Sequence, residues 1–329
     1  MRRAVIGLAA LFVAFWVPFW FSPYWVTVGI DVGVFAILGV SYNLLLGRIG
    51  LFSLGHALLY GVAAYAVADF TTRSGLGLLP SAVLAVLASG LVAAVTGLVA
   101  SGARGIYFAM MTLAFAQVGF VLAETDAAGL SGGEDGLTVS GIPELLNVNV
   151  RQDGLYWLAL ATLAAVLVVV AVLRTSAAGQ LWSAIRENEV RAAALGVDVR
   201  RQRVIAYAVA GVLAGVAGVI FSLSVQTVTP STMSVSVTVQ ALLITVIGGT
   251  GTFWGPVLGA LFVRTSAPLL DQLADTRAVQ GLSDPVERAL TSQPLILGTV
   301  YILFVLFLPG GLAALGRRRR AGPVLGGPS

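Results

Sequence analysis

Two residue types are missing from this sequence, and a third occurs once. None of the 329 residues is cysteine, and His56 is the single histidine. Thiolate metal sites, disulfides, iron–sulfur clusters and cysteine nucleophiles are therefore excluded, and we expect no metal site. Lysine is absent as well, so all 19 basic residues are arginine. Because a Walker A loop needs its lysine on the nucleotide phosphates, this chain does not bind ATP in that way.

Charged residues are scarce, which indicates that lipid is the main solvent of this protein. Only 10% of the residues are charged and 58% are hydrophobic, whereas soluble domains usually carry about 25% charged residues. Since backbone groups in lipid must be paired internally, we predict an all-α polytopic membrane protein whose partner is the lipid bilayer. The net charge of +4 does not predict nucleic-acid binding, because the arginines lie at the ends of apolar runs.

About eight transmembrane helices are expected, because that many apolar runs approach the roughly 20 residues that cross a bilayer. No small-residue cleavage site follows the first run, so we interpret it as an uncleaved span and not as a signal peptide. The predicted spans are residues 4–21, 26–46, 54–70, 78–100, 106–123, 155–173, 204–223 and 294–308.

The positions of arginine predict how these spans are oriented. Simple alternation places both termini, Arg48, Arg104 and the loop 174–203 on one side of the membrane. The positive-inside rule assigns that side to the cytoplasm. The loop 124–154, which is rich in Glu, Asp and Gly, is then external.

The apolar region 239–263 is interrupted by small residues. Two complete crossings by this region and by 294–308 would place the arginine run 317–320 outside, so we predict a broken or re-entrant pair of half-length helices. Two ordinary spans are the alternative. The residues expected to break helices here are Gly248, Gly249, Gly251, Gly255 and Pro256, and a second break is expected at Gly47, Gly50 and Gly55.

These features predict a single transmembrane domain over residues 1–316. The remaining residues, 317–329, form a basic, Gly/Pro-rich tail that we expect in the cytoplasm.

The loop 174–203 contains an amphipathic segment at 179–196. Leu181, Ile185 and Val190 recur near helical spacing, and Gly196 can end a helix in the left-handed conformation. We predict one short cytoplasmic helix. It either docks into a groove on a partner protein or lies on the membrane interface, and the pattern alone fits both.

Polar residues inside the predicted spans are candidates for a translocation pathway, because such residues are costly in lipid. Hydrogen bonding between helices is an alternative that fits each of them equally well. The candidates are Asn43, Ser53, His56, Tyr107, Thr112 and Gln117.

Six sequence blocks in a fixed order strongly resemble the branched-chain amino acid permease family of ABC importers, and specifically the second permease of the pair. The block in the cytoplasmic loop reads Ala-Ile-Arg-Glu-Asn-Glu from residue 184, followed by Ala-Leu-Gly from residue 194. The other blocks lie at 42–57, 105–115, 132–136, 247–256 and 308–312. Together they extend over nearly the whole chain.

The resemblance implies a permease subunit in the bacterial plasma membrane that is not an enzyme and binds no cofactor itself. It implies four partners: a homologous second permease, two ATP-binding subunits that carry ATP with Mg, and an extracytoplasmic substrate-binding protein. The residues that match the ATPase-coupling position are Arg186, Glu187, Asn188, Glu189, Leu195 and Gly196.

Other classes of function are possible from the residues alone. A self-sufficient secondary transporter or channel for a small polar solute would also use broken helices, but it would not need the segment 186–196. A membrane enzyme fits least, because the spans contain no carboxylate pair or Ser/His/Asp set. We therefore expect an importer of branched-chain amino acids or a related small polar nutrient.

Overall fold

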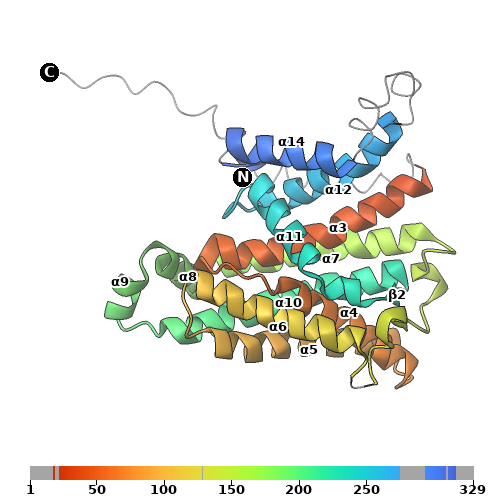
Figure 1. The fold of residues 1–329 in the computed structure, drawn as a ribbon, viewed down its shortest axis with the longest axis horizontal. Coiled ribbons are helices and arrows are strands. Elements are labelled where there is room, and N and C mark those ends of the chain that lie inside the picture. The colour runs from red at the N-terminus through yellow and green to blue at the C-terminus, as the bar shows by residue number, and fades with distance from the viewer. Residues whose placement is uncertain (1–17, 19–21, 128, 275–292, 309, 316–329) are drawn as a thin grey trace.

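The structure, a computed structural model, describes residues 18, 22–127, 129–274, 293–308 and 310–315 (Figure 1). Six long helices form most of it, and each lies over an apolar run that predicted a span. They are α3 (Pro23–Leu44), α4 (His56–Thr72), α5 (Leu78–Ala100), α6 (Ile106–Glu124), α7 (Gln152–Thr175) and α10 (Val199–Val225). The predicted span 4–21 lies outside the described residues except for Pro18.

Shorter elements connect and cover these helices. The α-helices are α8 (Ala177–Glu187), α9 (Glu189–Ala194), α11 (Val235–Gly248), α12 (Gly255–Ala274), α14 (Gln293–Phe307) and α15 (Leu312–Leu315). The other elements are the π-turn η1 (Leu45–Ile49), the 3-10 turns η2 (Gly133–Asp135), η3 (Glu144–Leu146) and η4 (Pro230–Met233), and the strands β1 (Leu137–Thr138) and β2 (Thr227–Val228).

Five stretches of the described chain are long and apolar enough to cross a membrane. They are Pro23–Ile49, Leu78–Ala100, Ile106–Glu124, Gln152–Thr175 and Val199–Val225. The prediction of an all-α, multi-pass membrane protein is therefore confirmed, while the total of about eight spans stays a prediction.

Helix α3 is the centre of the bundle. It packs against α7, α10, α11 and α12, and every residue from 33 to 45 is buried. Helices α5 and α6 instead carry large exposed apolar side chains such as Leu91 and Ile106, at 66% and 71% exposure. Such an outward apolar face suits lipid or another apolar protein surface.

Small residues allow α4, α5 and α10 to approach closely. The Ser89 hydroxyl on α5 donates to the carbonyl oxygens of Leu59 on α4 and Gly211 on α10, at 2.7 and 2.8 Å. A Cβ atom at Gly211 would overlap the side chain of Ala93. Close backbone approach through small residues, supported by hydroxyl hydrogen bonds, is typical of helix packing in membranes.

The two ends of the bundle differ in structure (Figure 1). At one end, which we call the α8–α9 end, lie α8, α9 and η1. At the other, the β1–β2 end, the predicted external loop 124–154 contains η2, β1 and η3. Strand β1 pairs antiparallel with β2, which follows α10, with Leu137 opposite Val228. The loop is therefore attached to the bundle by backbone hydrogen bonds.

The region 239–263 contains two helices, α11 and α12, with a turn between them. The turn at 249–254 lies next to η1, at the α8–α9 end. The predicted boundary at residue 263 differs from the structure, because α12 continues to Ala274 and contains Arg264. This arginine is accommodated within the helix because it pairs with Asp31 on α3.

Candidate functional site at the α8–α9 end

The segment between α7 and α10 is two helices and not the single helix that its periodicity predicted. Ser176 caps α8, where its hydroxyl accepts from the Gly179 N–H at 3.3 Å. Asn188 adopts extended backbone angles and caps α9, where Oδ1 accepts from the Arg191 N–H at 2.8 Å. Short polar side chains compete for backbone hydrogen bonds in this way. The helix therefore stops and restarts at Asn188.

Apolar contacts attach α8 to the bundle. Trp182 and Ile185 are buried, at 1% and 4% exposure. The Trp182 Nε1 donates to Gln202 Oε1 on α10 at 3.1 Å. Because the two apolar residues lie three positions apart on one helical face, α8 packs along a single stripe. These two side chains therefore anchor α8 to the bundle beneath it.

Ion pairs attach α9. Glu189 accepts a hydrogen bond from Arg203 Nη2 at 2.7 Å and pairs with Arg104 Nε at 3.4 Å. Arg203, whose side chain is 9% exposed, also donates to the carbonyl oxygens of Ser101 and Ala103. Of the residues predicted for coupling, Asn188 and Glu189 are thus engaged within the chain.

Two apolar side chains project from the tip of this segment. Val190 is 76% exposed and Leu195 is 79% exposed. Gly196, at φ +87°, ends α9 in the left-handed region that favours glycine. Glu187 is also exposed. Val190 was not among the predicted coupling residues, because those were chosen by resemblance to the family's coupling position, whereas Val190 was noted only as part of the helical apolar pattern.

Arginine side chains connect this segment to both helix breaks. Arg186 on α8 donates to the carbonyl oxygen of Gly47 in η1. Arg48 Nη1 donates to Ser183 Oγ on α8 at 2.9 Å, and Arg174 Nη2 donates to the carbonyl oxygen of Gly251 at 3.1 Å. A cavity of about 520 Å³ is lined by Arg48, Arg186, Ser183 and Glu187 together with Gly47 and Gly251.

The two breaks also contact each other directly. Asn43 donates through Nδ2 to Thr252 O at 2.8 Å, and its Oδ1 accepts from the Gly251 N–H at 2.7 Å. A Cβ atom at Gly47 would lie 2.6 Å from the Gly251 nitrogen, so the two backbones meet only because residue 47 is glycine. This junction of η1 with the 249–254 turn is hereafter called the break junction.

The predicted break residues occupy the ends of these helices. In the first break, Gly50 ends η1 at φ +80° and Gly55 precedes α4. In the second, Gly248 is the last residue of α11, Gly249 and Gly251 have φ of +112° and +72°, and Gly255 and Pro256 begin α12.

Two of the predicted pathway residues, Ser53 and His56, are buried together beside the first break. The Ser53 Oγ lies 3.3 Å from the Tyr207 hydroxyl. His56 Nε2 lies 2.9 Å from the Ser41 hydroxyl, which itself donates to Ala210 O. Since that hydroxyl proton is already used, His56 Nε2–H is the donor. These bonds hold α3, α4 and α10 together.

The rest of the predicted pathway residues lie on α6 or, like Asn43, in the break junction. Thr112 is buried, and its hydroxyl accepts from the Leu54 N–H at 3.1 Å. Tyr107 is 70% exposed and Gln117 is also exposed, so they lie on the outer face of α6. The structure therefore groups four of the six residues and separates Tyr107 and Gln117 from them.

Comparison with known proteins identifies relatives over almost the whole chain. Residues 25–308 match the family described as branched-chain amino acid transport system / permease component. The chain is 25% identical to the high-affinity branched-chain amino acid transport system permease protein LivM of Salmonella typhimurium, over 96% of its own length and 76% of that protein. It is 26% identical to LivM of Escherichia coli, over 95% and 75% of the two chains.

Two further similarities are more limited. The chain is 34% identical to the autoinducer 2 import system permease protein LsrC of an Enterobacter species, over 32% of each protein. Among solved structures, PsaBC from Streptococcus pneumoniae in complex with Fab has a TM-score of 0.47 at 14% identity and covers 94% of this chain and 99% of its own.

The family match includes α3 to α14, and thus the break junction, α8 and α9. The resemblance inferred from six sequence blocks is confirmed by this match. The chain belongs to the family of branched-chain amino acid transport system permease components.

Proposed function

We propose that this chain is a transmembrane subunit of an ABC importer for branched-chain amino acids or a related small polar nutrient, and that separate ATPase subunits drive it through α8 and α9. The family match supports the transport function. The observation that supports the site of coupling is the exposed tip of α9, which is rigidly joined to the bundle. On this proposal no residue of the chain is catalytic.

The tip is suited to docking into a groove. Val190 and Leu195 present apolar surface at 76% and 79% exposure, and the helices behind them are held by Trp182 and by the Glu189–Arg203 ion pair. An apolar anchor on a rigid element loses little conformational entropy when a partner buries it. Of the predicted coupling residues, Leu195 and Glu187 are therefore available for contact.

Movement of α8 would reach the break junction through polar contacts. Arg186 bonds to Gly47 and Arg48 bonds to Ser183, so α8 is connected to η1 in both directions. Gly47 in η1 lies against Gly251 of the 249–254 turn, and the Asn43 side chain at the end of α3 bonds to the same turn. We propose that this route transmits the movement that switches the permease between its inward-open and outward-open states. Asn43, Ser53, His56, Tyr107, Thr112 and Gln117 stay candidates for the translocation pathway.

Orientation and partners are part of the same proposal. We place the α8–α9 end and both termini in the cytoplasm of a bacterial inner membrane, because the arginines gather there. ATP and Mg belong to two ATPase subunits at that end. The β1–β2 end would receive an extracytoplasmic substrate-binding protein. A second, homologous permease would cover part of the apolar outer faces of α5, α6 and α7.

Co-purification tests the coupling site. The full-length chain is purified in mild detergent with its ATPase subunits, and compared with the double variant Val190→Arg, Leu195→Arg. Both side chains are exposed, so the variant is expected to fold and to lose the ATPase. Val150→Arg, at 60% exposure beyond η3, is the control and should retain it.

Two outcomes would contradict the proposal. ATPase retained by the double variant would show that α8 and α9 are not the docking element. If the wild-type chain retains no ATPase and uptake continues on an ion gradient alone, the chain is a secondary transporter.

A further inference from the structure

Two arginine side chains cross in opposite directions between η1 and α8, and both line the cavity of about 520 Å³ at the break junction. Arg48 extends from η1 to α8, where it bonds to Ser183 at 2.9 Å. Arg186 extends from α8 to the carbonyl oxygen of Gly47 in η1. Residues 183 and 186 lie three positions apart, on one face of α8. Both guanidinium groups are therefore held at the same cavity.

Neither guanidinium group has a carboxylate partner in the part of the chain that the structure describes. None of the ion pairs there includes Arg48 or Arg186. Each donates one hydrogen bond to the described chain, although a guanidinium group has five N–H donors. The Nε of Arg48 is also buried without a partner among these residues. Because two like charges repel each other, an anion that contacts both would be stabilised.

One acidic side chain, Glu187, lines the same cavity. Its carboxylate forms no ion pair with either arginine among the described residues. Glu187 is exposed, so water and salt screen its charge. The lining thus carries two positive formal charges and one negative charge, and the cavity selects anions.

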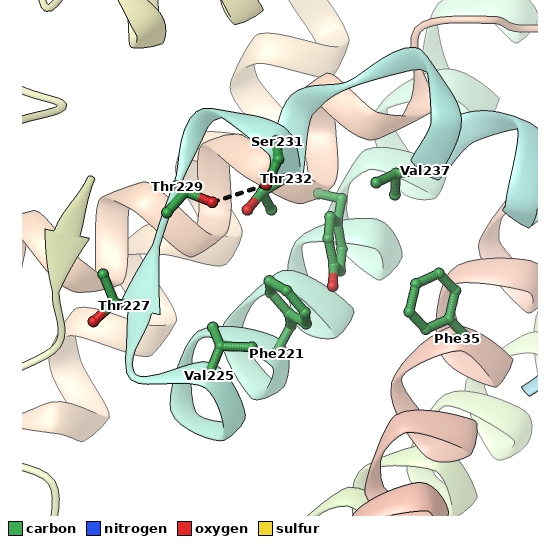
Figure 2. A pocket seen from close by; sticks show the side chains of 9 residues that line it. Phe35, Phe221, Val225, Thr227, Thr229, Ser231, Thr232 and Val237 are labelled. Carbon is green, nitrogen blue, oxygen red and sulfur yellow. Dashed lines mark hydrogen bonds between the residues drawn. The ribbon is translucent and has the colours of Figure 1, made fainter. Parts of the chain in front are cut away.

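A cavity toward the β1–β2 end has a different lining (Figure 2). Its volume is about 290 Å³. Figure 2 shows the rings of Phe35 and Phe221 on one side of it and the hydroxyl side chains of Thr227 and Thr229 on another. None of the described residues that line it is charged. The preference for an anion therefore belongs to the cavity between η1 and α8.

The position and size of the cavity between η1 and α8 suit a phosphate group. Arg48 is the penultimate residue of the apolar stretch Pro23–Ile49, and α8 begins two residues after the stretch Gln152–Thr175 ends. Lipid headgroups lie at the ends of such stretches, and basic pockets at that depth bind them. The planar fork of arginine matches phosphate oxygens. A volume of about 520 Å³ is also within the usual range for ligand pockets.

We infer that the cavity between η1 and α8 is a phosphate-binding site in which Arg48 and Arg186 contact the phosphate oxygens. The phosphate belongs to a phospholipid headgroup or to free phosphate in solution, since the recognition chemistry is the same. A bound phosphate bridges α8 and η1. The site adds to the proposed function and is separate from the exposed tip of α9.

Thermal shift of the full-length chain in mild detergent tests the site, because a ligand of the folded state raises the melting temperature as its concentration rises. The probes are inorganic phosphate at constant ionic strength and dihexanoyl phosphatidylglycerol. Dihexanoylglycerol, which lacks the phosphate, is the control probe. The variants are Arg48→Gln, Arg186→Gln and Glu187→Gln. The control variant is Arg201→Gln, since Arg201 is exposed on α10 and does not line the cavity.

At least one phosphate probe should raise the melting temperature of the wild-type chain, and dihexanoylglycerol should not. Arg48→Gln and Arg186→Gln each weaken the apparent affinity about 10- to 100-fold, as expected for charged hydrogen bonds. Glu187→Gln strengthens it about 2- to 5-fold, because a screened repulsive charge is removed. Arg201→Gln leaves it unchanged. A shift by phosphatidylglycerol alone identifies a phospholipid as the ligand, and a shift by inorganic phosphate identifies phosphate from solution.

Three results would overturn the inference. If neither phosphate probe shifts the wild-type chain, the two arginines are left for an acidic side chain of a partner protein. If Arg201→Gln weakens binding as much as Arg48→Gln, the attraction is general and not a site. Weaker binding by Glu187→Gln would contradict the assigned charge of the ligand. The test includes no ATPase, so its outcome is independent of the proposed coupling.

Discussion

Asn43 holds the break junction together, so its replacement tests whether the two helix breaks form one unit. The side chain makes hydrogen bonds of 2.8 and 2.7 Å to Thr252 O and the Gly251 N–H, and it is 7% exposed. Asn43→Ala leaves one partly buried carbonyl and one partly buried N–H without these partners. Each such loss costs about 1–3 kcal/mol. We therefore expect the free energy of unfolding to fall by about 2–6 kcal/mol.

Thermal unfolding of the purified chain in detergent measures this change. A loss of that size corresponds to a melting temperature lower by at least about 3 °C for a chain of this length. Asn149→Ala is the matched control, because Asn149 is exposed and donates to Gln226 Oε1 at 2.9 Å. Exposed substitutions usually change stability by less than about 0.5 kcal/mol. Equal melting temperatures for the two variants would refute the reasoning.

Three further predictions follow from other contacts. Glu189→Gln weakens the bond to Arg203 and should lower stability in denaturant titration by about 1–3 kcal/mol, whereas the exposed Glu187→Gln should not; equal effects would contradict the assigned role of the ion pair. Gly136→Ala should speed proteolysis of the loop 124–154, because the new Cβ atom would lie 2.8 Å from the Val228 carbonyl carbon. Gly141 has a similar positive φ but no atom near its Cβ position, so Gly141→Ala should change the proteolysis rate less. The Ser131 N–H and hydroxyl bond to Asp126 and hold its pKa below the usual 3.8. The ionised Asp126 carboxylate therefore stabilises the turn at 126–131 above pH 3.8, and this support is lost as the pH falls through the lowered pKa. A spin label at Leu130 should accordingly gain mobility only below about pH 4. A gain near neutral pH would argue against this role of Asp126.

The sequence predicted the long helices well because their cause is local. Residues 106–123 and 155–173, for example, were predicted as spans and lie within α6 and α7. An apolar run in lipid must pair its backbone groups within itself, whatever its neighbours are. The six ordered sequence blocks also predicted the family, which the match over residues 25–308 confirms.

The local structure of the candidate site was predicted only in part. The segment 179–196 was predicted to be a single coupling helix. Its coupling role stays a prediction, and the single helix was wrong, because the side chain of Asn188 caps a second helix. Helical periodicity continues smoothly across such a capping residue and does not reveal it. Periodicity also grouped Val190 with Leu181 and Ile185, although in the structure Ile185 is buried and Val190 is 76% exposed.

Composition and apolar runs by themselves determined that this is a multi-pass helical membrane protein, because the length and apolarity of each run decide its solvent. Only the tertiary structure decided which polar groups meet. Arg186 bonds to Gly47 across 139 residues, and Arg264 bonds to Asp31 across 233 residues. These partners depend on which helices pack together and on how the helices are shifted along one another. The local pattern of a single sequence contains neither piece of information. Arg264 therefore resembled the end of a span in the sequence, whereas in the folded chain it is part of a charged pair inside the bundle.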